Sequence, residues 1–251
     1  MKALITGASS GIGLDMARIL SSQGCELFIV ARRKSKLEKI KKELKTKVTV
    51  IEMDISSTFN CMKLYNMVKD ENIDILINNA GFGLFGAFND SNLDRELDMI
   101  DLNIKGVHTL TKLFLKDFKK RDYGYILNVS SSAGFLPGPL MATYYASKAY
   151  VLNLSLAIHQ ELKKENSNVY IGVLCPGPVS TEFNKVAKVE FNLKSMSSYD
   201  VADIAIKGMF KRKMVIIPGI KMKISIFFTK LLPLSLKLEI AYHLQRRKGR
   251  K

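Results

Sequence analysis

The sequence predicts a single α/β domain built on a doubly wound parallel sheet. Short runs of valine, isoleucine and leucine alternate with longer segments of helical periodicity, and this alternation indicates repeated β-α-β units. The chain has 251 residues and 47% hydrophobic content, enough to bury the core of one large domain. Since no linker rich in proline, glycine or serine divides it, we expect residues 1–217 to form this domain and residues 218–251 a helical, basic C-terminal extension.

The first strand is expected at Lys2–Thr6, and the glycine turn Gly7–Gly13 follows it. A helix comes next, because apolar residues after the turn recur at helical spacing: Met16, Ala17, Ile19 and Leu20. Further apolar runs predict strands at Glu26–Ala31, Lys47–Met53, Asp74–Ile77, Tyr125–Val129, Val169–Leu174 and Met214–Ile217. Longer segments predict helices at Ser35–Lys45, Phe59–Lys69, Leu93–Lys120 with a break near Asn103–Gly106, Met141–Glu165 and Val201–Lys211.

The turn after the first strand has the glycine spacing G-x-x-x-G-x-G, formed by Gly7, Gly11 and Gly13. A strand, a glycine turn and a helix in this order direct backbone N–H groups and a helix N-terminus at a phosphate. Ser9 and Ser10 add hydroxyl groups to the same turn. The pattern indicates a nucleotide phosphate site, with an ordinary strand–helix turn as the alternative.

Tyr144 and Lys148 are four residues apart, so a helix places the phenol and the ammonium on one face. An adjacent positive charge favours the phenolate, so this pair suits acid/base chemistry. Tyr145 is three residues from Lys148, and helix geometry alone does not exclude it. Ser131 precedes Tyr144 by thirteen residues in the run 130–132, and strand alternation turns its two neighbours to the other side.

Composition argues against several other functions. The cysteines and histidines are scattered without metal-ligand spacing, so we expect free thiols in a reducing compartment and no metal site. The net charge is +16, but no basic groove with interleaved aromatic residues is evident, so we expect solvated lysine faces and no nucleic acid partner. Because the first strand begins at residue 2, we expect no signal peptide and a cytoplasmic protein.

Six motifs in register resemble those of the short-chain dehydrogenase/reductase family. They are Thr6-Gly7-x-x-x-Gly11-x-Gly13, Asn78-Asn79-Ala80-Gly81, Asn103, Ser131, Tyr144-x-x-x-Lys148 and Pro176-Gly177. Their order and separations fit the family from residue 1 to about residue 217. The resemblance implies a Rossmann-type fold and an oxidoreductase that interconverts a carbonyl group and an alcohol.

The family resemblance also implies catalytic roles, and it selects Tyr144 rather than Tyr145. Tyr144 would be the general acid in reduction and the base in oxidation, and Lys148 would lower its pKa and bind the nicotinamide ribose. Ser131 would donate a hydrogen bond to the substrate oxygen as negative charge develops there. Asn103 would hold a helix kink and a water that links Lys148 to solvent.

The cofactor implied by the resemblance is NADP(H). Arg32 and Arg33 follow the second strand, where the adenosine ribose should lie, and a guanidinium suits a 2′-phosphate better than a free hydroxyl. The alternative is a solvated basic pair. The other residues placed against the cofactor are Gly7, Ser9, Ser10, Gly11, Ile12, Gly13, Asp54, Ile55, Asn78, Ala80, Gly81, Tyr144, Lys148, Pro176, Gly177, Val179 and Thr181.

The substrate is expected to be a hydrophobic ketone, aldehyde or 3-oxoacyl compound, or the matching alcohol. The region after Pro176-Gly177, which shapes the pocket in this family, is apolar here. The predicted wall consists of Phe183, Val186, Val189, Phe191 and Leu193, with Leu136, Pro137, Leu140 and Met141 opposite. The rival interpretation is a non-catalytic cofactor-binding or membrane-surface protein on the same fold.

The extension is expected to form two helices separated by Pro233. The first has a predicted apolar face of Ile224, Phe227, Phe228, Leu231 and Leu232, and the second has one of Leu234, Leu238, Ala241 and Leu244. Three arrangements are open: packing on the domain or across a dimer, a lid over a pocket, or contact with an anionic membrane surface. We favour packing or a lid, expect no spanning helix, and expect a homodimer or homotetramer.

Overall fold

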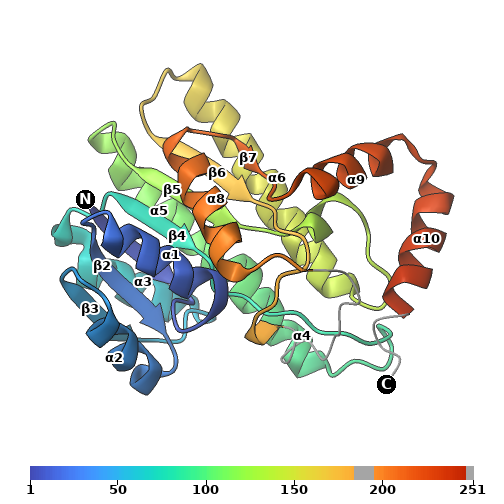
Figure 1. The fold of residues 1–251 in the computed structure, drawn as a ribbon, viewed down its shortest axis with the longest axis horizontal. Coiled ribbons are helices and arrows are strands. Elements are labelled where there is room, and N and C mark those ends of the chain that lie inside the picture. The colour runs from blue at the N-terminus through green and yellow to red at the C-terminus, as the bar shows by residue number, and fades with distance from the viewer. Residues whose placement is uncertain (184–194, 247–251) are drawn as a thin grey trace.

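The computed structural model describes residues 1–183 and 195–246 (Figure 1). The described residues form one seven-stranded sheet, parallel throughout, in the order β3-β2-β1-β4-β5-β6-β7. The strands are β1 (Lys2–Thr6), β2 (Glu26–Ala31), β3 (Val48–Glu52), β4 (Ile75–Asn78), β5 (Tyr125–Val129), β6 (Tyr170–Leu174) and β7 (Val215–Ile216). The sheet confirms the predicted doubly wound α/β fold.

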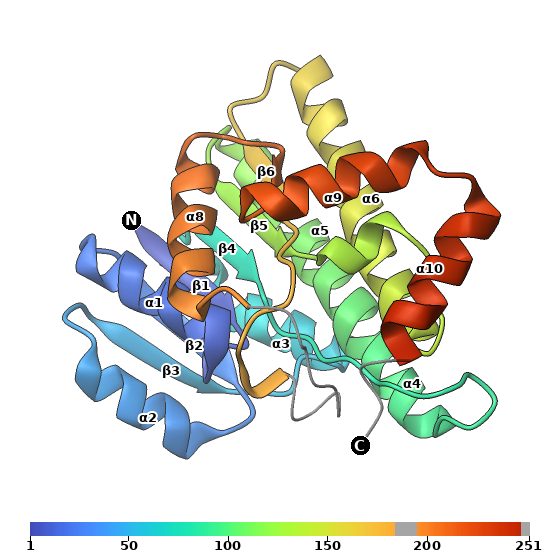
Figure 2. The same ribbon diagram turned by 45° about the vertical axis from the view of Figure 1, so that its right-hand side comes forward.

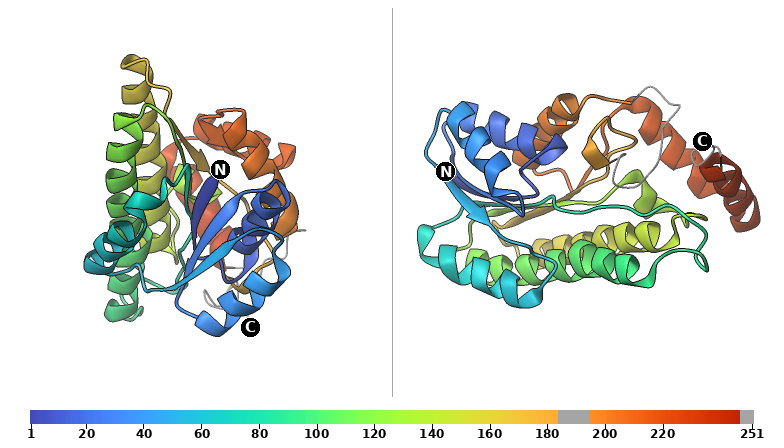
Figure 3. Two further views of the ribbon diagram at one scale, coloured as in Figure 1. Left: turned by 90° about the vertical axis from the view of Figure 1, so that its left-hand side faces the viewer. Right: turned by 90° about the horizontal axis from the view of Figure 1, so that it is seen from below.

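Helices cover both faces of this sheet, and the two layers separate clearly in Figure 3. One face carries α1 (Gly11–Ser22), α2 (Lys34–Glu43) and α8 (Ser198–Phe210). The other carries α3 (Thr58–Val68), α5 (Val107–Lys120) and α6 (Ala142–Lys164). Residues of β1 alternate between the two layers, with Ala3 and Ile5 in one core and Leu4 in the other, because successive strand residues point to opposite faces.

The strand order reverses beside β1, which pairs with β2 on one side and β4 on the other. Chain connections leave β1 and β4 in opposite directions, so a crevice opens beyond their carboxyl ends. Thr6 and Asn78 end these two strands. The motifs predicted to bind a cofactor therefore meet at this edge of the sheet.

Three segments add detail to the predicted elements, and one of them is the unpredicted 3₁₀ helix η1 (Lys69–Glu71) after α3. The helix expected over residues 93–120 is α4 (Leu93–Ile100), a π-helical turn at Asp101–Gly106 and α5, which places the π turn at the predicted break. A Cβ atom on Gly106 would lie 2.6 Å from the carbonyl oxygen of Ile55, so this turn packs closely on the chain after β3. An unpredicted 3₁₀ helix, η3 (Ser132–Phe135), follows β5.

The extension forms α9 (Ile220–Leu231) and α10 (Leu234–Arg246), at the edge of the molecule in Figure 2. α9 packs against η3, but it does so through Met222 and Ile226. The helix therefore packs on the domain as expected, but four residues of its predicted apolar face, Ile224, Phe227, Phe228 and Leu231, are exposed, and only Leu232 is partly buried. Within the described residues, no helix combines the length and apolar content needed to cross a membrane.

Candidate active site

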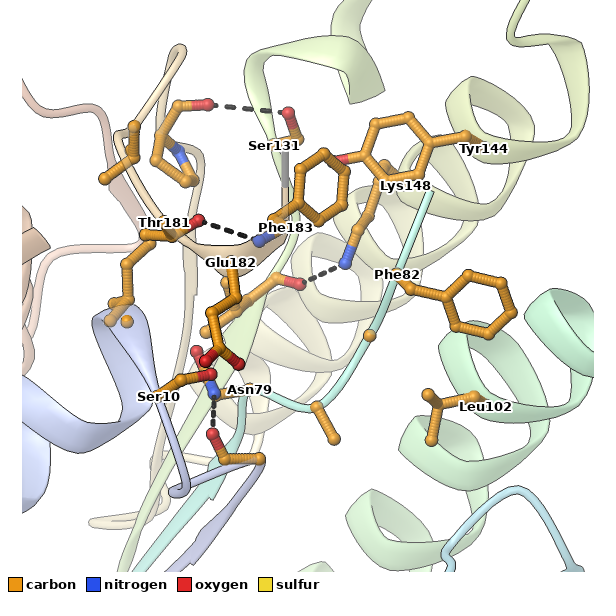
Figure 4. Close-up of a pocket in the computed structure, with 18 of the residues that line it drawn as sticks. Ser10, Asn79, Phe82, Leu102, Ser131, Tyr144, Lys148, Thr181, Glu182 and Phe183 are labelled. Carbon is orange, nitrogen blue, oxygen red and sulfur yellow. Dashed lines mark hydrogen bonds between the residues drawn. The ribbon is translucent and has the colours of Figure 1, made fainter. Parts of the chain in front are cut away.

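A cavity of about 420 Å³ lies beyond the carboxyl ends of the strands (Figure 4). It brings together most of the residues predicted from the sequence: Gly7, Ser9, Ser10, Gly11, Ile12, Arg32, Arg33, Asp54, Ile55, Ala80, Gly81, Ser131, Tyr144, Lys148, Pro176, Gly177, Val179 and Thr181. Three other predicted residues, Gly13, Asn78 and Asn103, lie behind this wall within the described part of the chain. Segments far apart in sequence thus build one site.

The glycine turn contains backbone conformations that residues other than glycine adopt only with strain. Gly7 and Gly11 have φ values of +67° and +55°, in the left-handed region that favours glycine. A Cβ atom on Gly13 would lie 2.6 Å from the carbonyl oxygen of Gly7, so a larger residue would push α1 away from the turn. No described side chain caps the N-terminus of α1, so its first N–H groups remain available to a phosphate.

Asn79 supports this turn, although the sequence analysis did not assign it a role. Its side-chain amide donates to the carbonyl oxygens of Thr6 at 3.0 Å and Gly7 at 3.2 Å. Asn78 differs from the prediction, because its amide points into the core and donates to Thr111 and Asn128 at 3.0 and 2.9 Å. In this asparagine pair, strand alternation directs the second residue to the cavity wall and the first to the core.

In the serine run after β5, the Ser130 hydroxyl points into the protein as predicted, but Ser132 lines the cavity together with Ser131, because η3 begins at Ser132 and ends the strand alternation. Ser130 is buried, and its hydroxyl donates to the carbonyl oxygen of Lys148 at 2.7 Å. The Ser131 oxygen accepts from the backbone N–H of Ala133 at 3.1 Å, and its hydroxyl donates to the carbonyl oxygen of Pro176 at 3.4 Å. Ser131 therefore faces the cavity from a fixed position between η3 and the chain after β6.

Tyr144 and Lys148 extend from α6 into the same part of the cavity, as Figure 4 shows. The Lys148 ammonium donates to the carbonyl oxygen of Val129 at 3.0 Å and lies 5.9 Å from the centre of the Tyr144 ring. Burial lowers the pKa of Lys148 to about 8. Burial raises the pKa of Tyr144, and the adjacent Ser131 hydroxyl opposes this only in part.

The direction of the Tyr144 shift corrects the sequence-based expectation. A nearby lysine was expected to lower the phenol's pKa, but both groups are buried, and desolvation disfavours a charge on either. In this state Tyr144 is a protonated hydroxyl that can donate a proton.

Tyr145, the alternative acid/base, is engaged elsewhere. Its hydroxyl accepts a hydrogen bond from the side-chain amide of Gln245, at the end of α10. Gln245 is buried, and its amide oxygen has no partner within the described residues. The structure therefore separates the two tyrosines, with Tyr144 beside Lys148 and Tyr145 bound to the C-terminal extension.

Asn103 connects the π turn to the loop after β4. Its amide oxygen accepts from the backbone N–H of Phe82 at 3.1 Å, and its NH₂ group donates to the carbonyl oxygen of Phe82 at 2.9 Å and to Ser147 at 3.1 Å. A Cβ atom on Gly81 would lie 2.9 Å from the Asn103 oxygen and 3.3 Å from the Lys148 nitrogen. Asn103 and Lys148 thus meet at Gly81, where the close approach requires glycine.

Beside the end of β2, the two predicted arginines have different partners. Arg33 donates to the Glu182 carboxylate at 2.7 Å and to the Ser9 hydroxyl at 3.2 Å. Lys36 donates to the other oxygen of Glu182 at 2.5 Å, and these two cations lower the pKa of Glu182 to about 2. Arg32 lies 3.7 Å from the Asp54 carboxylate. Glu182 and Lys36 were not predictable from the sequence, because no local pattern joins two residues so distant along the chain.

The predicted substrate wall is only partly formed as expected. Phe183 and Met141 line the cavity, and the Phe183 ring centre lies 5.4 Å from that of Tyr144. Phe82, Leu102 and Arg95 also line it and were not predicted. Of the remaining predicted wall residues, Leu136 lines a second cavity. Pro137 and Leu140 are absent from the described walls of both cavities. The other four lie outside the described residues: Val186, Val189, Phe191 and Leu193.

The second cavity, of about 160 Å³, lies between η3 and the two C-terminal helices. It shares Ser132, Ala133 and Tyr145 with the first cavity, so the two are adjacent. Its other lining residues are mainly apolar: Leu136, Met222, Ser225, Ile226, Thr229, Leu232, Lys237, Ile240, Ala241 and Leu244. The extension therefore adds apolar volume beside the site that holds Tyr144.

The fold and the site together define a dinucleotide-binding α/β oxidoreductase. A profile described as short chain dehydrogenase matches residues 1–190, and this chain belongs to that family. It is an enzyme that acts on CH–OH and C=O groups with a nicotinamide dinucleotide as cofactor.

Known proteins of several substrate classes are similar to the chain. A "Probable NADP-dependent dehydrogenase" of Haemophilus influenzae is 34% identical over 219 residues, which cover 81% of this chain and 85% of that protein. The human very-long-chain 3-oxoacyl-CoA reductase is 31% identical over 220 residues, which cover 84% and 69%. A short-chain dehydrogenase of Sphingobium yanoikuyae in complex with NADPH has a TM-score of 0.81 and 30% identity, covering 87% and 88%.

Proposed function

We propose that this protein is an NADP(H)-dependent oxidoreductase that interconverts a carbonyl group and an alcohol on a hydrophobic substrate. The observation that carries the proposal is the meeting of Ser131, Tyr144 and Lys148 in a cavity that also contains the glycine turn. A phosphate-binding turn and an acid/base group at one edge of the sheet suit a reaction between a dinucleotide and a second molecule. We place the reaction itself at Tyr144.

In the reducing direction, the Tyr144 hydroxyl gives its proton to the carbonyl oxygen. Ser131 donates a hydrogen bond to that oxygen and stabilises the negative charge that develops there. The Tyr144 hydroxyl is protonated in the free site, because the ordinary tyrosine pKa is about 10 and burial raises it further. The Lys148 ammonium stabilises the phenolate that remains. The bound cofactor supplies the hydride, and in the oxidising direction it accepts one.

Asn103 has a positioning role in this proposal. Its paired hydrogen bonds to Phe82 hold the loop after β4 beside the Lys148 ammonium. The carbonyl oxygen of Val129 fixes the same ammonium from the other side. The position of the charge therefore depends on both the π turn and the end of β5.

The cofactor assignment to NADP(H) is supported by charge at the end of β2. Arg32, Arg33 and Lys36 gather beside the rim of the cavity, and no acidic residue directly follows β2 to receive a ribose hydroxyl. Guanidinium groups bind phosphate oxygens through paired N–H donors. The relatives named for NADP and crystallised with NADPH agree with this choice.

The hydrophobic substrate is supported by the walls near Tyr144. Phe82, Leu102, Met141 and Phe183 give this end of the cavity an apolar lining, and the second cavity continues it beyond Tyr145. A ligand that occupies both has an extended apolar part. The human relative named for very-long-chain 3-oxoacyl-CoA makes 3-oxoacyl thioesters the first class to test.

The test is NADPH consumption by the purified protein with 3-oxoacyl thioesters of increasing chain length, hydrophobic ketones, steroids and aldehydes. NADH is run in parallel on every substrate. We expect turnover with NADPH that improves with apolar length. Tight NADPH binding without turnover on any class would favour a non-catalytic cofactor-binding protein. Faster turnover with NADH would contradict the cofactor assignment.

A further inference from the structure

The first helix of the extension carries its larger apolar face on the outside. Ile220, Ile224, Phe227 and Leu231 are spaced four, three and four residues apart, so they form one stripe along α9. Their exposed fractions are 67%, 50%, 61% and 67%. The opposite side contains Ile226, which is only 6% exposed and packs toward η3. Folding of the single chain therefore leaves the stripe in water.

The exposed apolar surface extends beyond this stripe. Phe228, next to Phe227 on α9, is 59% exposed, and Leu234 at the start of α10 is 63% exposed. Single exposed apolar residues are common on folded proteins, whereas a contiguous apolar patch marks a surface that contacts something else. The stripe and these two residues have the character of such a patch.

The charge around the patch is almost entirely positive. Residues 211–251 contain twelve lysines and arginines and one acidic residue, Glu239, which accounts for +11 of the chain's +16. Lys221 and Lys223 lie on α9 on either side of the apolar stripe, and both are exposed. The sequence has no acidic residue between Asp203 and Glu239. An apolar stripe with cations along both edges matches an anionic layer that has an apolar interior.

We propose that α9 docks this enzyme on the surface of an anionic lipid bilayer, with the helix lying in the plane of the interface. The stripe enters the boundary between headgroups and acyl chains, and Lys221 and Lys223 meet the anionic headgroups. A second copy of the chain is a poorer occupant, because a symmetric contact along this stripe would bring lysines of like charge together. The helix is too short to span a bilayer.

The test measures co-sedimentation of the full-length protein with two kinds of vesicle, phosphatidylcholine alone and phosphatidylcholine mixed with phosphatidylglycerol. We expect binding to the anionic vesicles, weakened by salt, and little binding to the neutral ones. The double variant Phe227→Ser, Leu231→Ser should bind at least about tenfold more weakly, because each lost apolar side chain removes buried area. Lys221→Glu, Lys223→Glu should weaken binding to anionic vesicles specifically.

The matched control is Phe59→Ser, Phe88→Ser, which removes two phenylalanines that are each 69% exposed on other parts of the surface. This variant should bind vesicles as the unaltered protein does, and all variants should keep NADPH affinity, which reports intact folding. Equal vesicle binding by the Phe227→Ser, Leu231→Ser variant would overturn the proposal, as would equal binding to neutral vesicles. Light scattering that shows a dimer broken by the same variant, without vesicle binding, would assign the stripe to a second copy.

Discussion

The two ends of the cavity hold their functional groups in different ways. At the proposed catalytic end, Tyr144 and Lys148 are buried, and the Lys148 ammonium is fixed by a backbone carbonyl group. At the proposed adenosine end, the side chains of Arg32 and Arg33 are 69% and 47% exposed, and their partners are the carboxylates of Asp54 and Glu182. Burial gives the catalytic groups altered pKa values, whereas exposed ion pairs can exchange partners at little cost. We therefore expect substitutions at the buried end to change the turnover rate sharply. Substitutions at the exposed end should shift the preference between NADPH and NADH in smaller steps.

The largest effect is expected for Tyr144→Phe. Removing the hydroxyl deletes the proposed proton donor, and general acid catalysis contributes about 10²- to 10⁴-fold to rate, so we expect a loss in kcat of about 10³-fold. NADPH affinity, measured by fluorescence titration, should be retained. Tyr145→Phe is the matched control, because its hydroxyl binds Gln245, and its kcat should change only a few-fold. A comparable loss in both variants would remove the distinction between the two tyrosines.

The second prediction concerns the pH dependence of stability. The folded pKa of Lys148, about 8, is below its ordinary value of 10.5, so folding below pH 8 carries the full cost of burying a charge. Above pH 8 the folded state releases this proton while the unfolded state keeps it, so the contribution of Lys148 to stability should become more favourable by about 2 kcal/mol between about pH 8 and pH 10. Burial raises the pKa values of the Cys61 and Cys175 thiols, and these act in the opposite direction, so the Lys148 contribution is measured by urea unfolding as a difference from a variant without this amine.

Lys148→Met isolates this contribution, because methionine has similar length without the ionisable group. The parent protein should therefore gain about 2 kcal/mol relative to this variant between about pH 8 and pH 10, and the variant should lose turnover. A constant difference in stability between the two proteins over this range would contradict the low pKa of Lys148.

A smaller effect is expected at the adenosine end. Arg32→Asp should lower the ratio of kcat/KM for NADPH to that for NADH by about tenfold, because a lost charge-assisted hydrogen bond is worth about 1.5–3 kcal/mol. Lys39→Asp makes the same charge change on the exposed side of α2 and should leave the ratio unaltered. The phosphate contact would be refuted by equal ratios in the Arg32 variant and the parent protein.

The smallest effect is expected for Glu182→Gln. The Glu182 carboxylate engages Arg33 and Lys36, so it competes with a phosphate for the same cations. Its pKa of about 2 means that it stays charged at any working pH. We expect NADPH affinity to rise a few-fold and NADH affinity to stay the same, measured by titration of each cofactor. Weaker NADPH binding would show that Glu182 supports the cofactor rather than competing with it.

Local patterns predicted most of the fold, and the differences have physical causes. The strand ends at Thr6 and Asn78 were predictable within a residue, because apolar runs stop where the chain leaves the sheet. The π turn was predictable only as a break near Asn103, since its geometry depends on the backbone of Phe82 and on Ser147. Glu182 was not predictable, because its partners lie about 150 residues earlier in the chain.

The sequence alone determined the order of β-α-β units, and its resemblance to the family singled out Ser131, Tyr144 and Lys148 as the proposed catalytic residues. The order of units follows from side-chain periodicity, which is local, and the carboxyl ends of parallel strands then meet at one edge of the sheet. Tertiary structure decided the raised pKa of Tyr144, the binding of Tyr145 to Gln245 and the outward direction of the stripe on α9. Burial and partner choice depend on elements that are distant in sequence, so only the packed chain defines them.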